Sequence, residues 1–142
     1  MGNTESVVKE ISIDASISKV WEALTKKEQI AKWLMPSDDF ELKAGATFNM
    51  MGESKGIKYP HICTIKEIVP EKKLSYTWAI KDKLSDTLVT YELEEQDGKT
   101  KLTLTHSGWD KVTLNKEGTT RDDYNNGWEQ VIPGLKKFVE SN

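Results

Sequence analysis

Residues 13–25 read IDASISKVWEALT and mark the passage from a strand to a helix. The preceding residues 7–14 alternate between apolar and polar types, which predicts a half-buried strand. Ser16 then stands where a helix N-cap would accept a hydrogen bond from a free backbone N–H. The apolar residues that follow recur at spacings of three and four, as in a short amphipathic helix: Ile17, Val20, Trp21 and Leu24.

A second short helix is expected directly after the first. Thr25 and Glu28 have the spacing of a capping box, in which each side chain satisfies a free backbone donor of the other residue. Ile30, Trp33 and Leu34 form the apolar side of this helix. Pro36 disfavours helical backbone in the residue before it, so we expect the helix to end there.

From Phe40 onward, apolar residues recur at every second position, which predicts about six antiparallel strands, in a curved sheet of about six to seven strands in all. We expect a turn region over residues 52–60, a strand over residues 61–69, and a hairpin turn at Asp97 and Gly98. The inward-facing residues of the clearest strands are Leu74, Tyr76, Trp78 and Ile80; Val89, Tyr91 and Leu93; and Leu102, Leu104 and His106.

The last segment predicts one long helix from about Thr120. Its apolar stripe has a period of 3.6 residues and consists of Tyr124, Trp128, Val131, Ile132, Leu135, Phe138 and Val139. Asn126 and Gly127 favour a turn, but the stripe stays in phase across them. Pro133 removes one backbone hydrogen bond, so we expect a kink there.

Composition limits the class of protein. The chain has 142 residues, a net charge of −3 and one cysteine, Cys63. We expect one domain over residues 1–142 with an ordered core over about 7–140, in a reducing, cytoplasmic setting without disulfides. No basic excess points to nucleic acid, and no apolar run has the roughly 20 residues that a membrane span needs.

The order of elements resembles the helix-grip fold of the START-like (SRPBCC) superfamily, an α+β fold also seen in the birch-pollen allergen. More narrowly, the chain is similar to the activator of heat-shock-protein-90 ATPase homologue-like family. The segments that carry this resemblance are residues 13–25, Trp33 with Pro36, Gly45 with Phe48, residues 74–78, residues 102–108, and Gly127 with Trp128.

The resemblance implies a cavity between a curved sheet and the long C-terminal helix. Relatives bind lipids, polyketides, hormones or other hydrophobic ligands there, and a minority carry out chemistry on them. It also implies a bacterial single-domain protein. A co-chaperone role is an alternative that we expect less, because in eukaryotic co-chaperones a separate N-terminal domain precedes a domain of this type.

Two arrangements of Cys63 would carry chemistry. His61, Cys63 and His106 could supply three zinc ligands with one open position, but no fourth ligand or metal-binding spacing is evident. Cys63 could also act as a nucleophile with a histidine. His61 is two residues away on the same strand, roughly 6–7 Å, which is too far for a hydrogen bond. A buried, inert cysteine is the commoner arrangement, so we expect no metal and no cofactor.

His106 ends an apolar strand face and needs a hydrogen-bond partner if it is buried. The simpler interpretation is that His106 is a structural histidine, hydrogen-bonded to the backbone or to Tyr91. The functional alternative is a polar anchor at the cavity, or the general base of a cyclase- or hydrolase-like enzyme.

The aromatic residues favour binding of a flat or greasy small molecule, although they could instead fill the interior by packing on one another. We expect non-catalytic binding of a lipid, polyketide or aromatic ligand, with no nucleic acid or membrane partner. The predicted ligand-binding residues are Trp33, Phe48, Met50, His61, Tyr76, Trp78, Tyr91, His106, Trp128 and Ile132.

Overall fold

The computed structural model describes residues 5–54, 56–112 and 121–141. Within these residues the chain forms one six-stranded antiparallel sheet, three α-helices and one 3₁₀ turn. The strands are β1 (Val7–Ile13), β2 (Thr47–Ser54), β3 (Ile57–Val69), β4 (Lys73–Ile80), β5 (Leu84–Gln96) and β6 (Lys99–Ser107). The helices are α1 (Ile17–Thr25), α2 (Lys27–Trp33) and α3 (Arg121–Glu140), and the 3₁₀ turn η1 is Trp109–Lys111.

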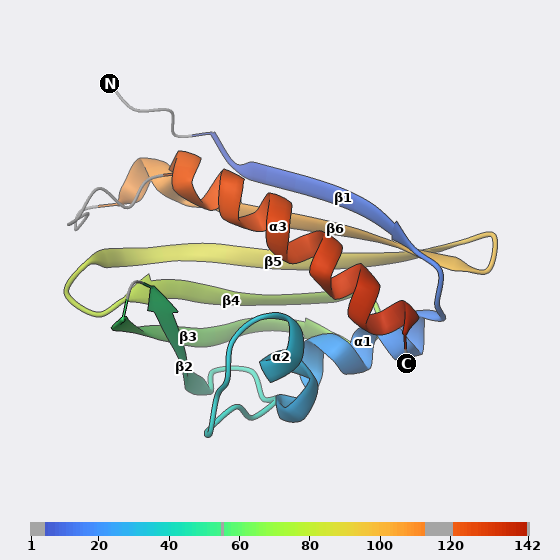
Figure 1. Ribbon diagram of the computed structural model, residues 1–142, viewed down its shortest axis with the longest axis horizontal. Helices are drawn as coiled ribbons and strands as arrows, with labels where there is room; N and C mark the ends of the chain where they lie inside the picture. Colours follow the sequence, from blue (N-terminus) through green and yellow to red (C-terminus); the bar gives the residue numbers. More distant parts are fainter. Residues whose placement is uncertain (1–4, 55, 113–120, 142) are drawn as a thin grey trace.

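The sheet has the order β1-β6-β5-β4-β3-β2. The first strand of the chain, β1, therefore pairs with the last, β6, and the edges of the sheet are β1 and β2. Helix α3 crosses one face of the sheet, and α1 and α2 lie near the C-terminal end of α3 (Figure 1). The core lies between these helices and the inward side chains of the strands. This is the predicted α+β helix-grip architecture, which is confirmed.

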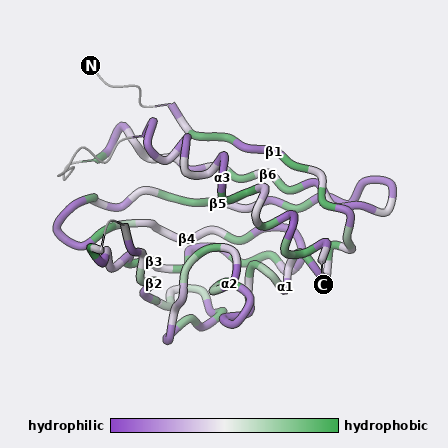
Figure 2. The backbone as a smooth tube through the Cα atoms, viewed as in Figure 1, coloured by the Kyte–Doolittle hydropathy of each residue, from purple (hydrophilic) through white to green (hydrophobic). Residues whose placement is uncertain are grey.

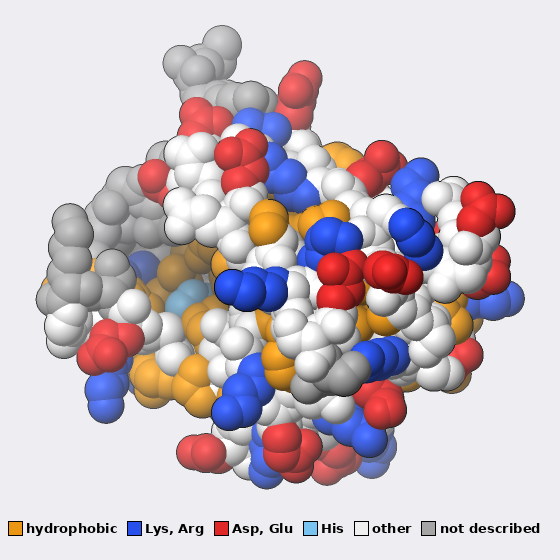
Figure 3. All heavy atoms as spheres, turned by 45° about the vertical axis from the view of Figure 1, so that its right-hand side comes forward, with side chains coloured by type: hydrophobic (Ala, Val, Ile, Leu, Met, Phe, Trp, Pro, Cys, Tyr) orange, Lys and Arg blue, Asp and Glu red, His pale blue; other side chains and the backbone are white. Residues whose placement is uncertain are grey.

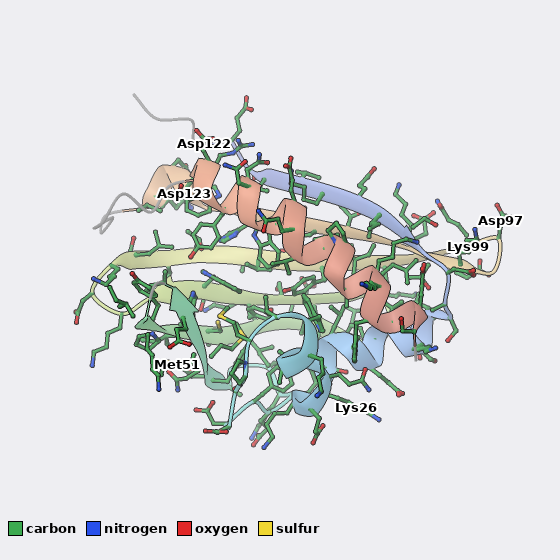
Figure 4. The ribbon with its side chains drawn as sticks, viewed as in Figure 1. Lys26, Met51, Asp97, Lys99, Asp122 and Asp123 are labelled. Atoms are coloured by element: carbon green, nitrogen blue, oxygen red, sulfur yellow. The ribbon has the colours of Figure 1, made fainter. Side chains whose placement is uncertain are left out.

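Local signals explain most of the element boundaries. Ser16 caps α1, because its hydroxyl accepts a hydrogen bond from the backbone N–H of Lys19 at 3.3 Å. Asp97 and Gly98 have φ angles of 54° and 81°, as the predicted two-residue hairpin turn requires, and Asp97 lies at the tip of the hairpin between β5 and β6 (Figure 4). The turns at the ends of the long strands are hydrophilic, and hydrophobic residues recur along the strands (Figure 2).

The predicted turn over residues 52–60 is wrong for most of its length. β2 continues to Ser54 and β3 begins at Ile57, four residues before the expected start, with Pro60 inside the strand. Pro60 is tolerated because it lies just beyond the last pair of β3 with β4, His61 with Ile80. Its carbonyl still accepts a hydrogen bond from the backbone of Lys81 at 3.2 Å. The missing N–H therefore falls where the ladder ends.

The capping box at Thr25 and Glu28 is also wrong. The hydroxyl of Thr25 bonds to the carbonyl of Trp21 at 2.7 Å, because Thr25 still belongs to the last turn of α1. The N-cap of α2 is Lys26, which makes no capping hydrogen bond through its side chain.

Helix α3 runs from Arg121 to Glu140 and includes Gly127 and Pro133. The expected start at Thr120 lies outside the described residues. Pro133 is exposed, so its lost hydrogen bond is on the solvent side, and the helix continues through it. The buried side of α3 consists of Trp128, Ile132, Leu135 and Val139.

Some backbone groups on the free edges of the outer strands β1 and β2 form hydrogen bonds with other segments of the chain. On β2, the backbone N–H of Met51 donates to the carbonyl of Pro36 at 3.1 Å. On β1, the carbonyl of Ser12 accepts from Nζ of Lys136 in α3 at 2.8 Å. The edge strands are thus tied to the loop after α2 and to α3, respectively. None of the helices in the described part of the chain is long and apolar enough to cross a membrane.

Candidate ligand-binding site

The ten predicted ligand-binding residues all lie in the interior. None of them is more than 7% exposed. They come from β2 to β6, from the end of α2 and from α3, so the alternation and the helical stripe identified inward-facing positions correctly. Eight of them form a filled group, a buried cluster around His106 and a pocket wall, and the last two of these sets share Trp128. Met50 lines a separate pocket beside Pro36 and Asn49, and Ile132 lies on the buried side of α3.

The filled group surrounds two tyrosines. The ring of Tyr91 meets that of Trp33 at a centroid distance of 6.1 Å, and the ring of Tyr76 meets that of Phe48 at 5.2 Å. The hydroxyls of Tyr76 and Tyr91 are 2.7 Å apart and hydrogen-bond to each other. Burial raises the pKa of both phenols above the usual value. These rings pack on one another and satisfy their own polar groups.

Cys63 lies in the same interior and is 0% exposed. Burial raises the pKa of its thiol far above the usual range, and the nearby charge of Asp86 acts in the same direction. A neutral, sealed thiol is a poor nucleophile, which argues against thiol catalysis. Within the described residues, no group of three or more His, Cys, Asp or Glu side chains could hold a metal ion.

His106 forms the centre of the buried cluster. The indole Nε1 of Trp128 donates to Nδ1 of His106 at 3.0 Å. Because indole is only a donor, Nδ1 is the acceptor and the ring hydrogen is on Nε2. Nε2 then donates to Oγ1 of Thr87 at 2.6 Å, and that hydroxyl donates to the carbonyl of Trp78 at 2.8 Å. One chain of hydrogen bonds thus links α3, β6, β5 and β4.

This arrangement makes His106 a structural residue. It is 0% exposed, and burial lowers its pKa from 6.5 to about 3. The lone pair on Nδ1 accepts the N–H of Trp128 and Nε2 is bonded to Thr87, so neither ring nitrogen is free to accept a proton from a substrate. The expected partner Tyr91 is replaced by Thr87 and Trp128, two residues that the sequence did not connect with His106.

The pocket wall includes three of the ten predicted residues: His61, Trp78 and Trp128. They line an open pocket of about 240 Å³ beside the N-terminal half of α3, together with Leu34, Met35, Tyr124, Gly127 and Val131. In the space-filling view, a histidine side chain is visible among hydrophobic side chains (Figure 3). Of the two histidines, only His61 has exposed surface, 7%.

The remaining wall residues were not among the predicted ten. Tyr124 and Val131 were on the apolar stripe of the helix, but the stripe does not tell which of its members contact open space. Leu34 was expected on the apolar side of the second helix but follows α2 directly, and Met35 comes after it, where the helix was expected to end. Gly127 was interpreted as a turn signal.

His61 is held by its backbone surroundings. Its Nδ1 donates to the carbonyl of Tyr59 at 2.8 Å, which leaves the lone pair of the neutral ring on Nε2. The ring packs edge-on against Trp78 at a centroid distance of 5.1 Å. Burial lowers the pKa of His61 and outweighs the opposing effect of the carbonyls of Tyr59 and Met50. At neutral pH, His61 therefore faces the pocket as an uncharged ring.

Gly52 on β2 gives His61 the room it needs. A Cβ atom at this position would lie 2.8 Å from Cε1 of His61 and 2.9 Å from Sδ of Met35. Both distances are shorter than van der Waals contact, so any larger residue would push these side chains out of place. Because Gly52 has no side chain, the side chains of His61 and Met35, which line the pocket, can pack against the backbone of β2.

A larger hollow, of about 380 Å³, lies between α1, α2 and the end of α3. Its walls carry charged or amide groups on Lys19, Glu22, Glu28, Gln29 and Lys32, and they contain one aromatic ring, that of Phe138, beside Val139. Ligand pockets for small molecules are predominantly apolar with a few polar groups. We therefore identify the aromatic pocket at His61 as the candidate site.

Helix α3 over the concave face of a meander sheet, with two short helices after the first strand, is the helix-grip architecture of the START-like (SRPBCC) superfamily. Residues 14–140 match the family model described as "Activator of Hsp90 ATPase homolog 1-like protein", and the chain belongs to that family.

Several solved structures share this fold. Protein CV1439 from Chromobacterium violaceum has a TM-score of 0.83 at 20% identity, with 96% of this chain and 97% of that chain covered. Protein MLL2253 from Mesorhizobium loti has a TM-score of 0.80 at 26% identity, with 97% and 98% covered. DynU16, described as a putative protein in the dynemicin biosynthetic locus, has a TM-score of 0.79 at 20% identity. This similarity covers 97% of the present chain but 48% of DynU16. No curated protein sequence matches the chain at a significant level.

Proposed function

We propose that the chain binds a hydrophobic or aromatic small molecule in the pocket at His61, without catalysing a reaction. The observation that carries this proposal is the composition of the wall: aliphatic and aromatic side chains surround a single buried imidazole. Such walls favour flat apolar ligands with one or two polar groups.

The size of the pocket narrows the class of ligand. Its volume of about 240 Å³ is below the roughly 300–1,000 Å³ of pockets for drug-sized molecules. A ligand with one or two fused rings suits this space better than a long lipid or a large polyketide. DynU16 has this fold and is described as a putative protein in a biosynthetic locus, which is consistent with binding of a small molecule by a protein of this fold.

The state of His106 supports binding rather than acid–base chemistry. Its nitrogens are engaged by Thr87 and Trp128, and its pKa of about 3 keeps it neutral over the physiological range. The enzyme alternative that uses His106 as a base therefore lacks a free proton acceptor. Binding to a chaperone remains the second alternative, suggested by the description of the family alone.

Native and denaturing mass spectra of the protein purified without added ligand test the proposal. We expect a native mass larger by a few hundred daltons at most, with the excess lost on denaturation. A parallel titration with 2-naphthol should quench the indole fluorescence of Trp78 and Trp128, because both line the pocket. Matching masses together with no response to 2-naphthol would contradict the proposal and favour a chaperone-binding assay instead.

A further inference from the structure

Gly127 lies inside α3, six residues after Arg121, where the helix begins. Apart from proline, glycine is the least favourable residue in a helix interior. Positions 124 and 131 are three and four residues away, so Gly127 lies on the same face of α3 as Tyr124 and Val131. All three residues line the pocket. A poor helix former therefore occupies the pocket face of the helix.

The open space beside Gly127 explains a glycine at this position better than its backbone conformation does. Gly127 has helical backbone, and a Cβ atom built on it would meet no atom within 4 Å. Neither a positive φ angle nor a close approach requires glycine at this position. What its missing side chain provides is open volume beside the backbone of α3.

The polar groups of the wall are mostly committed to the protein. The indole N–H of Trp78 donates to the hydroxyl of Tyr124 at 2.9 Å, and that of Trp128 donates to His106. The two indoles therefore offer a ligand their ring surfaces. The Nδ1–H of His61 is bonded to Tyr59, and Nε2 carries the lone pair.

We propose that Gly127 determines the ligand specificity of the pocket by opening a slot for a flat aromatic ring, and that Nε2 of His61 accepts a hydrogen bond from a hydroxyl group on that ring. This inference rests on the proposed function and specifies its ligand as a phenol-type aromatic of one or two rings. Gly52 and Gly127 act on opposite walls: Gly52 lets His61 settle against β2, and Gly127 keeps α3 free of a side chain.

The slot is tested with Gly127→Leu, and Gly134→Leu is the matched control. Gly134 lies on the same helix, is exposed, and its Cβ position also meets no atom within 4 Å. Both variants replace glycine by a better helix former, so neither should lower the Tm. We expect Gly127→Leu to weaken 2-naphthol binding at least tenfold and Gly134→Leu to leave it unchanged.

The hydrogen bond is tested with a second probe, 2-methoxynaphthalene, which has the same rings but no donor. We expect the protein to bind 2-naphthol about five- to tenfold more tightly, as one net hydrogen bond allows. His61→Phe keeps a flat ring in the wall and should remove this preference. The Tm of each variant shows whether the fold is intact.

The possible results distinguish a failure of this inference from a failure of the proposed binding function. If neither probe binds the unmodified protein, the proposed binding function fails and the inference fails with it. If both probes bind but Gly127→Leu behaves like Gly134→Leu, the slot is overturned while the binding function stands. If the preference for 2-naphthol persists in His61→Phe, the assignment of His61 as acceptor is overturned.

Discussion

The two histidines of this chain occupy neighbouring but opposite environments. His106 is 0% exposed and has a hydrogen-bond partner on each ring nitrogen. His61 is 7% exposed, has one nitrogen bonded to a backbone carbonyl, and lies on the wall of an open pocket. Trp78 separates them and contacts both rings, at centroid distances of 5.1 Å from His61 and 5.9 Å from His106.

The difference separates a histidine that ties elements of the fold together from one to which the proposed function assigns a ligand contact. Burial lowers the pKa of both histidines. What distinguishes them is the kind of partner and the access to solvent: side chains of Thr87 and Trp128 enclose His106, whereas backbone carbonyls hold His61 at the wall of an open pocket. A fully satisfied imidazole ties elements together, whereas a half-satisfied one at a pocket keeps an acceptor for a ligand.

Removing His106 should give the largest effect. We expect His106→Ala to lower the free energy of unfolding by about 3–5 kcal/mol, since it creates a cavity and leaves the buried indole N–H of Trp128 without an acceptor. Urea unfolding measures this loss. The matched variant His61→Ala should cost about 1–2 kcal/mol, because water can reach the pocket. Equal losses would break the distinction between the two histidines.

Lowering the pH should also decrease the free energy of unfolding, because it acts on His106 without a mutation. The unfolded chain protonates His106 near pH 6.5, whereas the folded protein does so only near pH 3. Protons therefore favour the unfolded state, and stability is full above pH 6.5 and falls as the pH decreases towards 3. At 1.36 kcal/mol per pH unit, the loss between pH 6.5 and pH 5 is about 2 kcal/mol.

Urea unfolding at both pH values measures this loss. Burial also lowers the pKa of His61, which adds to the loss in the same direction. His61→Phe removes that addition and should retain most of the pH dependence. A stability that does not change between pH 6.5 and pH 5 would show that His106 is not held neutral by the fold.

The two tryptophans of the cluster sharpen the comparison. Trp128→Phe and Trp78→Phe remove similar volumes, but only the first leaves a ring nitrogen of His106 without its donor. We expect Trp128→Phe to be more destabilising than Trp78→Phe by about 1 kcal/mol, because Nδ1 of His106 is sealed and the hydroxyl of Tyr124 is at the pocket. Thermal unfolding of both variants gives the difference, and an inverted order would contradict it.

The smallest effect is expected at the hydroxyl of Tyr124. Burial raises the pKa of this phenol to about 12, so it is neutral throughout the physiological range. Tyr124→Phe should cost about 0.5–1 kcal/mol, since water entering the pocket can replace the lost acceptor of Trp78. Tyr91→Phe is the buried counterpart and should cost about 1–2 kcal/mol, because the hydroxyl of Tyr76 is then left alone. Similar Tm values for the two variants would count against the difference in solvent access.

Periodicity in the sequence was sufficient for the architecture, because inward-facing side chains recur every two residues in strands and every three or four in helices. It failed at the ends of elements. Residues 52–60 suggested a turn because they are rich in Gly, Lys and Ser, but strands β2 and β3 extend into them, and the missing N–H of Pro60 falls at the end of a ladder. Thr25 suggested a cap because its spacing to Glu28 was right, but the last turn of α1 uses its hydroxyl.

The candidate site was predictable only in part, for a physical reason. Alternation identifies a side chain as inward-facing without telling what it meets there. Tyr91 and Trp33 meet each other, whereas His61 meets open space. The partners of His106 come from distant positions, Thr87 and Trp128, and no spacing in the sequence connects them. The ligand-binding role of the predicted residues stays a prediction.

Gly127 illustrates the same limit from the other side. Next to Asn126 it favours a turn by its intrinsic preference, yet it lies within α3. Its contribution is an empty volume, and an empty volume leaves no mark in the pattern of apolar residues.

The capped edges of the sheet have a consequence for behaviour at high concentration. An open sheet exposes unpaired backbone groups on its outer strands, and these are templates for pairing with another molecule. On β2, the N–H groups of Met51 and Asn49 are already bonded to Pro36 and to the carboxylate of Asp39. On β1, the carbonyl of Ser12 is bonded to Lys136. A strand from a second molecule would first have to displace these groups, so the fold resists intermolecular β-sheet growth and aggregation at both of its edges.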